Sequence, residues 1–175
     1  LHGWFVEHYG AEYVSTQVAY LTARMLTLDT QETYVESQID FYRKAGMRSD
    51  LFEVRKSERP FNFSDIVHAI PIGFKKIFEG DKIEMGGRTW DIRVDHGHAP
   101  DHATFWSCDD HLVLSGDQII PSISSNIGVY PTEPDANPLK EWMTSCERLK
   151  EFSKGDQLAL PGHKLPFFGI PLRLT

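Results

Sequence analysis

Apolar positions in the first 70 residues recur three and four apart, the spacing that predicts amphipathic helices. The first ten residues form one such segment, with Gly10 placed to end it. A short strand is predicted over 12–15. A second helix follows, with an apolar face of Val18, Leu21, Met25 and Leu26.

A third helix is predicted from Asp29 and Glu32, which resemble a capping box. This helix carries Val35, Ile39 and Tyr42 on one face and ends near Gly46. Residues 47–70 are charged and broken by Pro60, which indicates a short helix followed by a loop.

After Pro71 the pattern changes to alternation, which predicts strands. Residues 82–85 and 90–94 alternate on either side of Gly86-Gly87, a two-residue hairpin signal. Two more strands are predicted over 103–107 and 111–115, joined through Asp109-Asp110. We therefore expect an antiparallel sheet, and a further short strand over 157–160 that leads into Pro161-Gly162-His163.

A final helix is predicted after a long loop over 118–137, which holds three prolines. Long loops within compact domains are often functional. Asn137 is expected to cap the helix, with Pro138 at its first position. The buried stripe is predicted to consist of Leu139, Trp142, Met143, Cys146 and Leu149.

Composition and charge narrow the class of protein. The 175 residues fit one domain, and 41% hydrophobic residues suffice for a core. The net charge of -7 gives no basic surface, so a nucleic-acid partner is disfavoured. No apolar stretch approaches the roughly 20 residues of a membrane span. The only two cysteines, Cys108 and Cys146, indicate reduced thiols in a cytoplasmic protein.

The chemistry is concentrated among the eight histidines, three of which lie in the segment Asp95–His102 directly after a predicted strand. Neutral imidazole is a preferred ligand of borderline cations such as Zn²⁺. Asp117 and His163 also follow predicted strands, and each is preceded by a glycine, as His98 is. Any one of these signals is weak, but a strand, then glycine, then a metal-ligand type occurs three times.

The chain resembles the metallo-β-lactamase superfamily in three motifs and in their order along the sequence. The motifs are Gly97-His98-Ala99-Pro100-Asp101-His102, then Gly116-Asp117, then Pro161-Gly162-His163. The resemblance implies that His98 binds a first metal ion, that Asp117 bridges two ions and that His163 binds the second. It implies zinc, with iron or manganese as alternatives. It also implies hydrolysis of an ester, thioester, lactone or related bond of a small molecule by a hydroxide that the metals activate, with His98 and Asp117 as catalytic residues.

The resemblance also assigns subsidiary roles and a fold. His102, Asp101 and Tyr130 are candidates to orient a ligand or contact substrate, Asp95 is a further candidate to orient an imidazole, and His96 is expected to be structural. The implied fold is α+β: part of an αβ/βα sandwich with a mostly antiparallel sheet, forming one domain over 1–175. In it, 16–70 is a helical insertion and 71–175 supplies sheet, loops and helix.

The family motif H-x-H-x-D-H is not found in the chain, so four ligands that the resemblance implies are not among these residues. We therefore expect the chain to be truncated before that motif, to bind metal weakly by itself and to have negligible activity. We also expect it to form a homo-oligomer or to require the upstream segment. Two alternatives remain: a non-catalytic binding module that uses Asn126, Tyr130 and the 118–137 loop, and a purely structural α+β domain.

Overall fold

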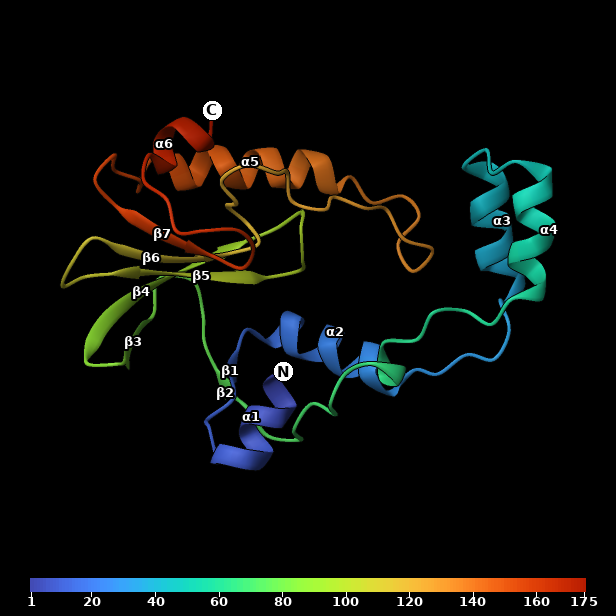
Figure 1. The fold of residues 1–175 in the computed structure, drawn as a ribbon, viewed down its shortest axis with the longest axis horizontal. Helices are drawn as coiled ribbons and strands as arrows, with labels where there is room; N and C mark the ends of the chain where they lie inside the picture. The colour runs from blue at the N-terminus through green and yellow to red at the C-terminus, as the bar shows by residue number, and fades with distance from the viewer. The chain divides into compact units, whose positions relative to one another are not determined.

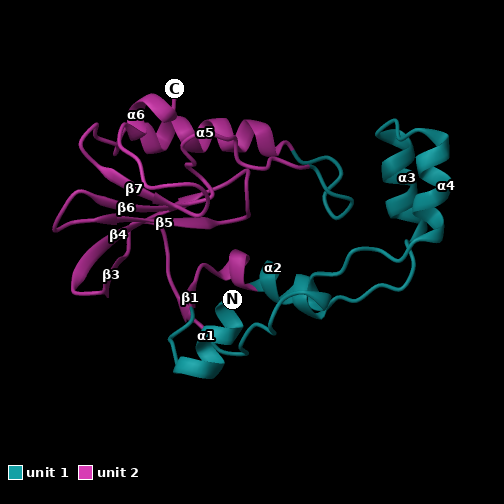
Figure 2. Ribbon diagram, viewed as in Figure 1, with its two compact units in different colours: residues 1–13, 21–73, 129–136 teal, residues 14–20, 74–128, 137–175 magenta.

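The structure is a computed structural model that describes all 175 residues and divides into two compact units (Figure 2). The first unit contains residues 1–13, 21–73 and 129–136. The second contains residues 14–20, 74–128 and 137–175. The division passes through one helix, α2 (Gln17–Leu28).

The first unit is helical and the second contains both sheets (Figure 2). Besides most of α2, the first unit holds α1 (His2–Tyr9), α3 (Glu36–Lys44), α4 (Ser49–Ser57) and a 3₁₀ turn over Phe63–Asp65. The second unit holds β1 (Val14–Ser15), β2 (Lys75–Lys76), β3 (Lys82–Met85), β4 (Arg88–Asp95), β5 (His102–Ser107), β6 (Leu112–Gly116), α5 (Pro138–Lys150), β7 (Leu158–Pro161) and α6 (Ile170–Arg173). None of the helices is long and apolar enough to cross a membrane.

The predicted helices of residues 1–28 are present, but the predicted apolar face of the second helix is not the face that is buried. In α1, which ends at Gly10 in the left-handed conformation, the buried residue is Gly3, where a side chain would collide with the backbone of Ala69. In α2 the four residues of the predicted apolar face are all exposed. The buried residue there is Tyr20, whose ring stacks on Phe74 at 3.9 Å. Helical spacing therefore identified the helices and not the contacts they make.

The third helix begins later than predicted, at Glu36, where the Val35 N–H donates to the Gln38 side chain. The reason lies in the buried Asn62. Its side chain accepts from the Gln31 N–H at 2.8 Å and donates to the Gln31 carbonyl at 3.0 Å. A helix that began at Asp29 would need a bond from the Val35 N–H to the Gln31 carbonyl, and here the carbonyl accepts from Asn62 while the Val35 N–H donates to Gln38. The predicted short helix and loop over 47–70 correspond to α4 and the residues after it.

The main sheet has five strands in the order β3-β4-β5-β6-β7 (Figure 1). The predicted hairpin joins β3 to β4, and both Gly86 and Gly87 have positive φ angles, as this tight turn requires. The strands from β3 to β6 are antiparallel to their neighbours, whereas β7 is parallel to β6. A separate parallel pair, β1 with β2, was predicted only in part, since the pattern gave no strand at Lys75–Lys76.

Strand direction decides which residues meet at one edge of this sheet. Because β5 is antiparallel to both β4 and β6, these two strands run the same way, and β7 runs parallel to β6. The C-terminal ends of β4, β6 and β7 therefore lie at one edge. The segments that begin after those ends carry His98, Asp117 and His163.

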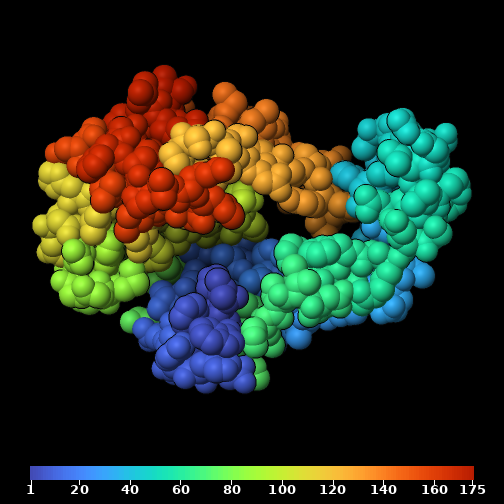
Figure 3. Space-filling view, in the orientation of Figure 1, coloured from blue at the N-terminus to red at the C-terminus, as the bar shows by residue number.

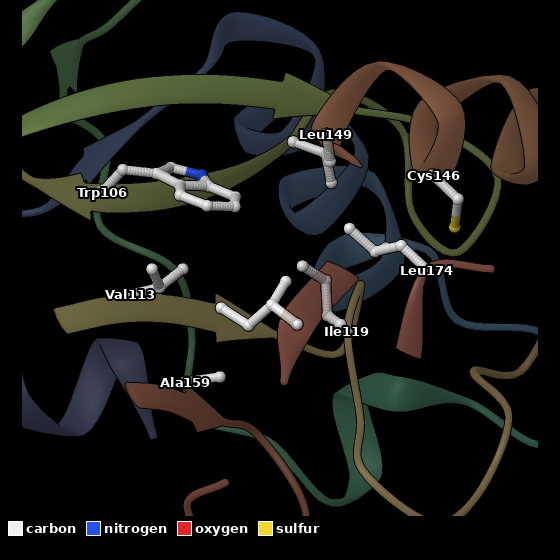
Figure 4. Packing of buried hydrophobic residues seen from close by; sticks show 8 residues of the cluster. Trp106, Val113, Ile119, Cys146, Leu149, Ala159 and Leu174 are labelled. Carbon is white, nitrogen blue, oxygen red and sulfur yellow. The ribbon is translucent and has the colours of Figure 1, made fainter. Parts of the chain in front are cut away.

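The core of the second unit lies between the sheet and the helices α5 and α6 (Figure 4). Its buried members are Trp106, Val113, Ile119, Cys146, Leu149, Ala159, Ile170 and Leu174. Two predicted members of the α5 stripe, Leu139 and Met143, are instead 56% and 57% exposed, because the helix turns Ser145, Cys146 and Leu149 inward. Asn137 caps α5 by accepting from the Lys140 N–H, as predicted. In the space-filling view the yellow β6 and orange-red β7 segments lie side by side (Figure 3).

Candidate metal centre

Three residues of the predicted site come together at the edge where β4, β6 and β7 end. The Nε2 atom of His98 lies 3.5 Å from Oδ2 of Asp117. The Nε2 atom of His163 lies 3.5 Å from the same oxygen. Residues separated by 65 positions in the sequence therefore present two imidazole nitrogens to one carboxylate oxygen.

The parallel pairing of β6 with β7 places Asp117 beside His163. The Gly162 N–H donates to the Gly116 carbonyl at 2.8 Å, which aligns the two strand ends one residue before each side chain. The register of the pair also shifts between Leu114 and Gly116. An irregularity of this kind at a strand end changes the direction in which the following side chain points.

The glycine before each of the three residues lies in close contact with its surroundings. A Cβ on Gly97 would lie 2.5 Å from atoms of Trp142 and Pro138 on α5, and a Cβ on Gly116 would lie 2.5 Å from the His102 ring. A Cβ on Gly162 would lie 2.3 Å from Oδ1 of Asp117. Gly97 and Gly116 also have positive φ angles, which disfavour any residue with a side chain.

Hydrogen bonds from a neighbouring loop orient His98 and Asp117. The His98 Nδ1 atom lies 3.0 Å from the carbonyl oxygen of Asn126, so Nδ1 carries the hydrogen and donates it. This tautomer leaves the Nε2 lone pair free toward Asp117, which is how metal-binding histidines are usually held. The Ser125 hydroxyl donates to the Asp117 carbonyl oxygen at 2.5 Å and anchors the same loop.

The Asp117 carboxylate is only partly satisfied by the protein. Its Oδ1 atom is buried and has no hydrogen-bond partner, and Oδ2 faces the two imidazoles. As they stand, no three His, Cys, Asp or Glu side chains are spaced to hold one ion. The geometry thus brings the three residues together, while their role as metal ligands stays a prediction.

The other predicted site residues occupy different positions. The Asp101 carboxylate lies 3.6 Å from His96 Nδ1, so neither it nor Asp95 is the group that orients His98. The His102 ring lies 6.2 Å from the His98 ring and covers Gly116, which places it against the site. His96 donates its backbone N–H to Ser145 on α5, in line with a structural role. Tyr130 belongs to the first unit and is not placed relative to these residues.

Asp95 is the most deeply buried charged group near the site, with no exposed surface. Its Oδ2 atom is 3.9 Å from His102 Nδ1, too far for a hydrogen bond, and both atoms lack another partner. Burial raises the pKa of the Asp95 carboxyl above its ordinary value, although His102 and the Arg148 guanidinium 3.5 Å away lower it. The protein therefore favours the neutral acid more than water does.

Sequence reasoning did not predict the orienting role of Asn126. It acts on His98 through its backbone carbonyl, and a carbonyl leaves no residue-type signal. Sequence reasoning also missed Ser125 and Gln118, whose positions depend on how the loop after Asp117 folds back. Their only signal was the length and composition of that loop.

Several solved structures are similar to the chain. A β-lactamase domain protein from Burkholderia ambifaria has a TM-score of 0.77 and 29% identity, over 94% of this chain and 44% of that protein. A metallo-β-lactamase family protein from Thermus thermophilus has a TM-score of 0.71 and 23% identity, over 97% of this chain and 52% of its own. TTHA1623, solved in a di-iron-bound form, has a TM-score of 0.56 and 18% identity, over 95% and 64%.

The chain thus spans about half the length of the first two similar structures. No family model and no curated sequence matches it. The fold is that of its structural neighbours, with mixed helices and strands and a mostly antiparallel sheet. The order of the three motifs, the strand ends that carry them and the similarity over nearly the whole chain agree, and together they support the assignment of the chain to the metallo-β-lactamase superfamily.

Proposed function

We propose that the chain carries part of the metal centre of a metal-dependent hydrolase, with His98, Asp117 and His163 as ligands. The observation that supports this most directly is the convergence of two imidazole Nε2 atoms on Asp117 Oδ2, each at 3.5 Å. The other oxygen of the same carboxylate, Oδ1, is buried and has no hydrogen-bond partner in the protein. Buried polar atoms are normally satisfied, so an unpaired one indicates an absent partner.

The donor atoms fit a borderline divalent cation. Imidazole nitrogen together with carboxylate oxygen suits zinc, and also iron or manganese. The His98 tautomer offers Nε2 rather than an N–H to such an ion. The di-iron-bound form of TTHA1623 supports metal use by this fold and leaves the choice of metal open.

A bound ion would supply Lewis acidity for attack of water on an ester, thioester or lactone carbonyl. The residues of the chain would position it: Asn126 fixes the His98 tautomer, Ser125 holds the backbone of Asp117, and Gly162 allows Asp117 to approach His163. The acidic net charge favours small acyl substrates over nucleic acids.

Three ligands are few for two ions, because catalytic zinc sites usually have three protein ligands each. We therefore expect the chain by itself to bind zinc weakly, at no more than one ion, and to lack measurable hydrolysis. Isothermal titration calorimetry with zinc alone tests this. Two tightly bound ions per chain would contradict the ligand count.

Substitutions test the site itself. Asp117→Ala, His98→Ala and His163→Ala should each abolish the zinc-binding heat. His111→Ala is the matched control, because His111 also pairs with an aspartate, Asp156 at 2.9 Å, but precedes β6 and so lies toward the other edge of the sheet. Unchanged zinc binding in the Asp117 variant would refute the proposal.

A second assay separates an enzyme from a binding module. In a protein where further ligands complete the site, hydrolysis of model esters, thioesters and lactones should depend on Asp117. Full metal occupancy without turnover of any of these would favour the module instead.

A further inference from the structure

Gln118, directly after Asp117, is a buried polar side chain without a partner in the protein. It is 1% exposed, and both its Oε1 and Nε2 atoms lack a hydrogen bond. Buried carboxamides in folded proteins nearly always have partners, and an ordered water supplies them where the protein does not. A side chain placed this way points to a small polar ligand.

Gln118 lines a small cavity together with Ser125 and Trp142. The cavity has a volume of about 10 Å³, which is close to the minimum for one water molecule and too little for an organic ligand. The Trp142 Nε1 atom is also buried without a partner. Three unpaired polar atoms, two of them N–H donors and one an acceptor, thus belong to residues that line a space for one water.

The cavity lies between the two backbone segments that position the candidate metal centre. Gln118 begins the loop that ends at Asn126, whose carbonyl holds His98. Trp142 packs on Gly97, the residue before His98. Arg173 of α6 fixes the same loop by donating to the carbonyls of Ile120 and Ile123.

We propose that one buried water molecule occupies this cavity, bridges the Gln118 carboxamide and the Trp142 indole N–H, and makes Gln118 a positioning residue for His98. The water joins the loop to α5. This connection keeps the Asn126 carbonyl within reach of His98 Nδ1 and so maintains the tautomer with a free Nε2. The occupation of the cavity is independent of the proposed function, whereas its value for metal binding rests on that function.

A crystal structure of the metal-free chain tests the first half. It should show density for one water within hydrogen-bond distance of the Gln118 carboxamide and Trp142 Nε1. Gln118→Met, which keeps the length of the side chain but removes its polar atoms, should lose that density. A Gln118 side chain bonded directly to protein atoms in the wild type, or a dry cavity, would overturn the proposal.

Nitrogen NMR of the metal-free chain tests the second half, at about pH 8, where an ordinary histidine with a pKa near 6.5 is neutral. The wild type should show His98 with its hydrogen on Nδ1. Gln118→Met and Trp142→Phe should both shift His98 toward the Nε2–H form, until the two tautomers are comparably populated. Gln157→Met is the matched control, because Gln157 accepts from the Lys154 N–H in a turn before β7 and lines no part of this cavity.

An unchanged His98 tautomer in both cavity variants would overturn the positioning role, and a shift in the Gln157 variant would do the same. Neither NMR nor crystallography here requires metal. A failure of zinc binding would therefore count against the proposed function alone, and the presence of the water and the His98 tautomer would still be decided separately.

Discussion

Gly162→Ala tests the geometry of the candidate metal centre through a single added methyl group. A Cβ at this position lies 2.3 Å from Asp117 Oδ1 and 3.2 Å from its Cγ. Real Cβ contacts essentially never fall below 3.0 Å, so the carboxylate must move by at least about 0.7 Å. Gly162 does not have a positive φ angle, so the substitution adds this collision without backbone strain.

The displacement is large compared with the tolerance of a metal site, where ligand distances vary by about 0.2 Å. We expect overpacking to cost about 1–3 kcal/mol of unfolding free energy, toward the low end because Asp117 is partly exposed. We expect the zinc dissociation constant to rise about tenfold or more, equivalent to about 1.4 kcal/mol. Chemical denaturation and competition with a chromogenic chelator measure the two quantities.

Gly155→Ala is the control, since a Cβ there meets nothing within 4 Å and its φ angle is not positive either. Its stability should be unchanged or slightly increased, because alanine reduces the freedom of the unfolded chain. The imidazole nitrogen shifts of His163 should move in Gly162→Ala and not in Gly155→Ala. If Gly162→Ala matches Gly155→Ala in stability, zinc affinity and these shifts, the close approach of Gly162 to Asp117 is incorrect.

Three further predictions concern the scaffold. Leu149→Ala, at a fully buried core position, should lower the unfolding free energy by about 2–5 kcal/mol in chemical denaturation. Met143→Ala, on the exposed side of the same helix, should change it by less than about 0.5 kcal/mol. Equal effects of the two substitutions would contradict the assignment of Leu149 to the core. Asn137→Ala should cost about 1 kcal/mol, because it removes the cap that accepts from the Lys140 N–H; a variant as stable as the wild type would show that the cap contributes nothing. Burial raises the pKa of the Asp95 carboxyl, so the folded state binds this proton more tightly than the unfolded state does. The stability that this provides is present below the ordinary pKa of 3.8 and is lost as the pH rises through the raised pKa. Urea denaturation over that range should give a flatter pH dependence for Asp95→Asn than for the wild type, and parallel curves would contradict the burial of this charge.

The sequence determined the features that depend on neighbouring residues. The Gly86-Gly87 turn, the Asn137 cap and the alternation of the strands were all predicted, because turn angles, caps and side-chain direction are set within a few residues. The three glycines followed by His98, Asp117 and His163 were visible for the same reason. Their order along the chain was enough to predict the family.

Tertiary structure decided which of these features meet. The parallel addition of β7 to β6, through bonds such as Gly162 N–H to Gly116 carbonyl, brings His163 to Asp117, and no local pattern encodes such a pairing. The same holds for Asn126, which contributes a carbonyl, and for Gln118, whose burial depends on α5. In α2 the helical spacing was correct and the predicted face was not the buried one, since burial depends on what packs against a helix and periodicity describes only the helix itself.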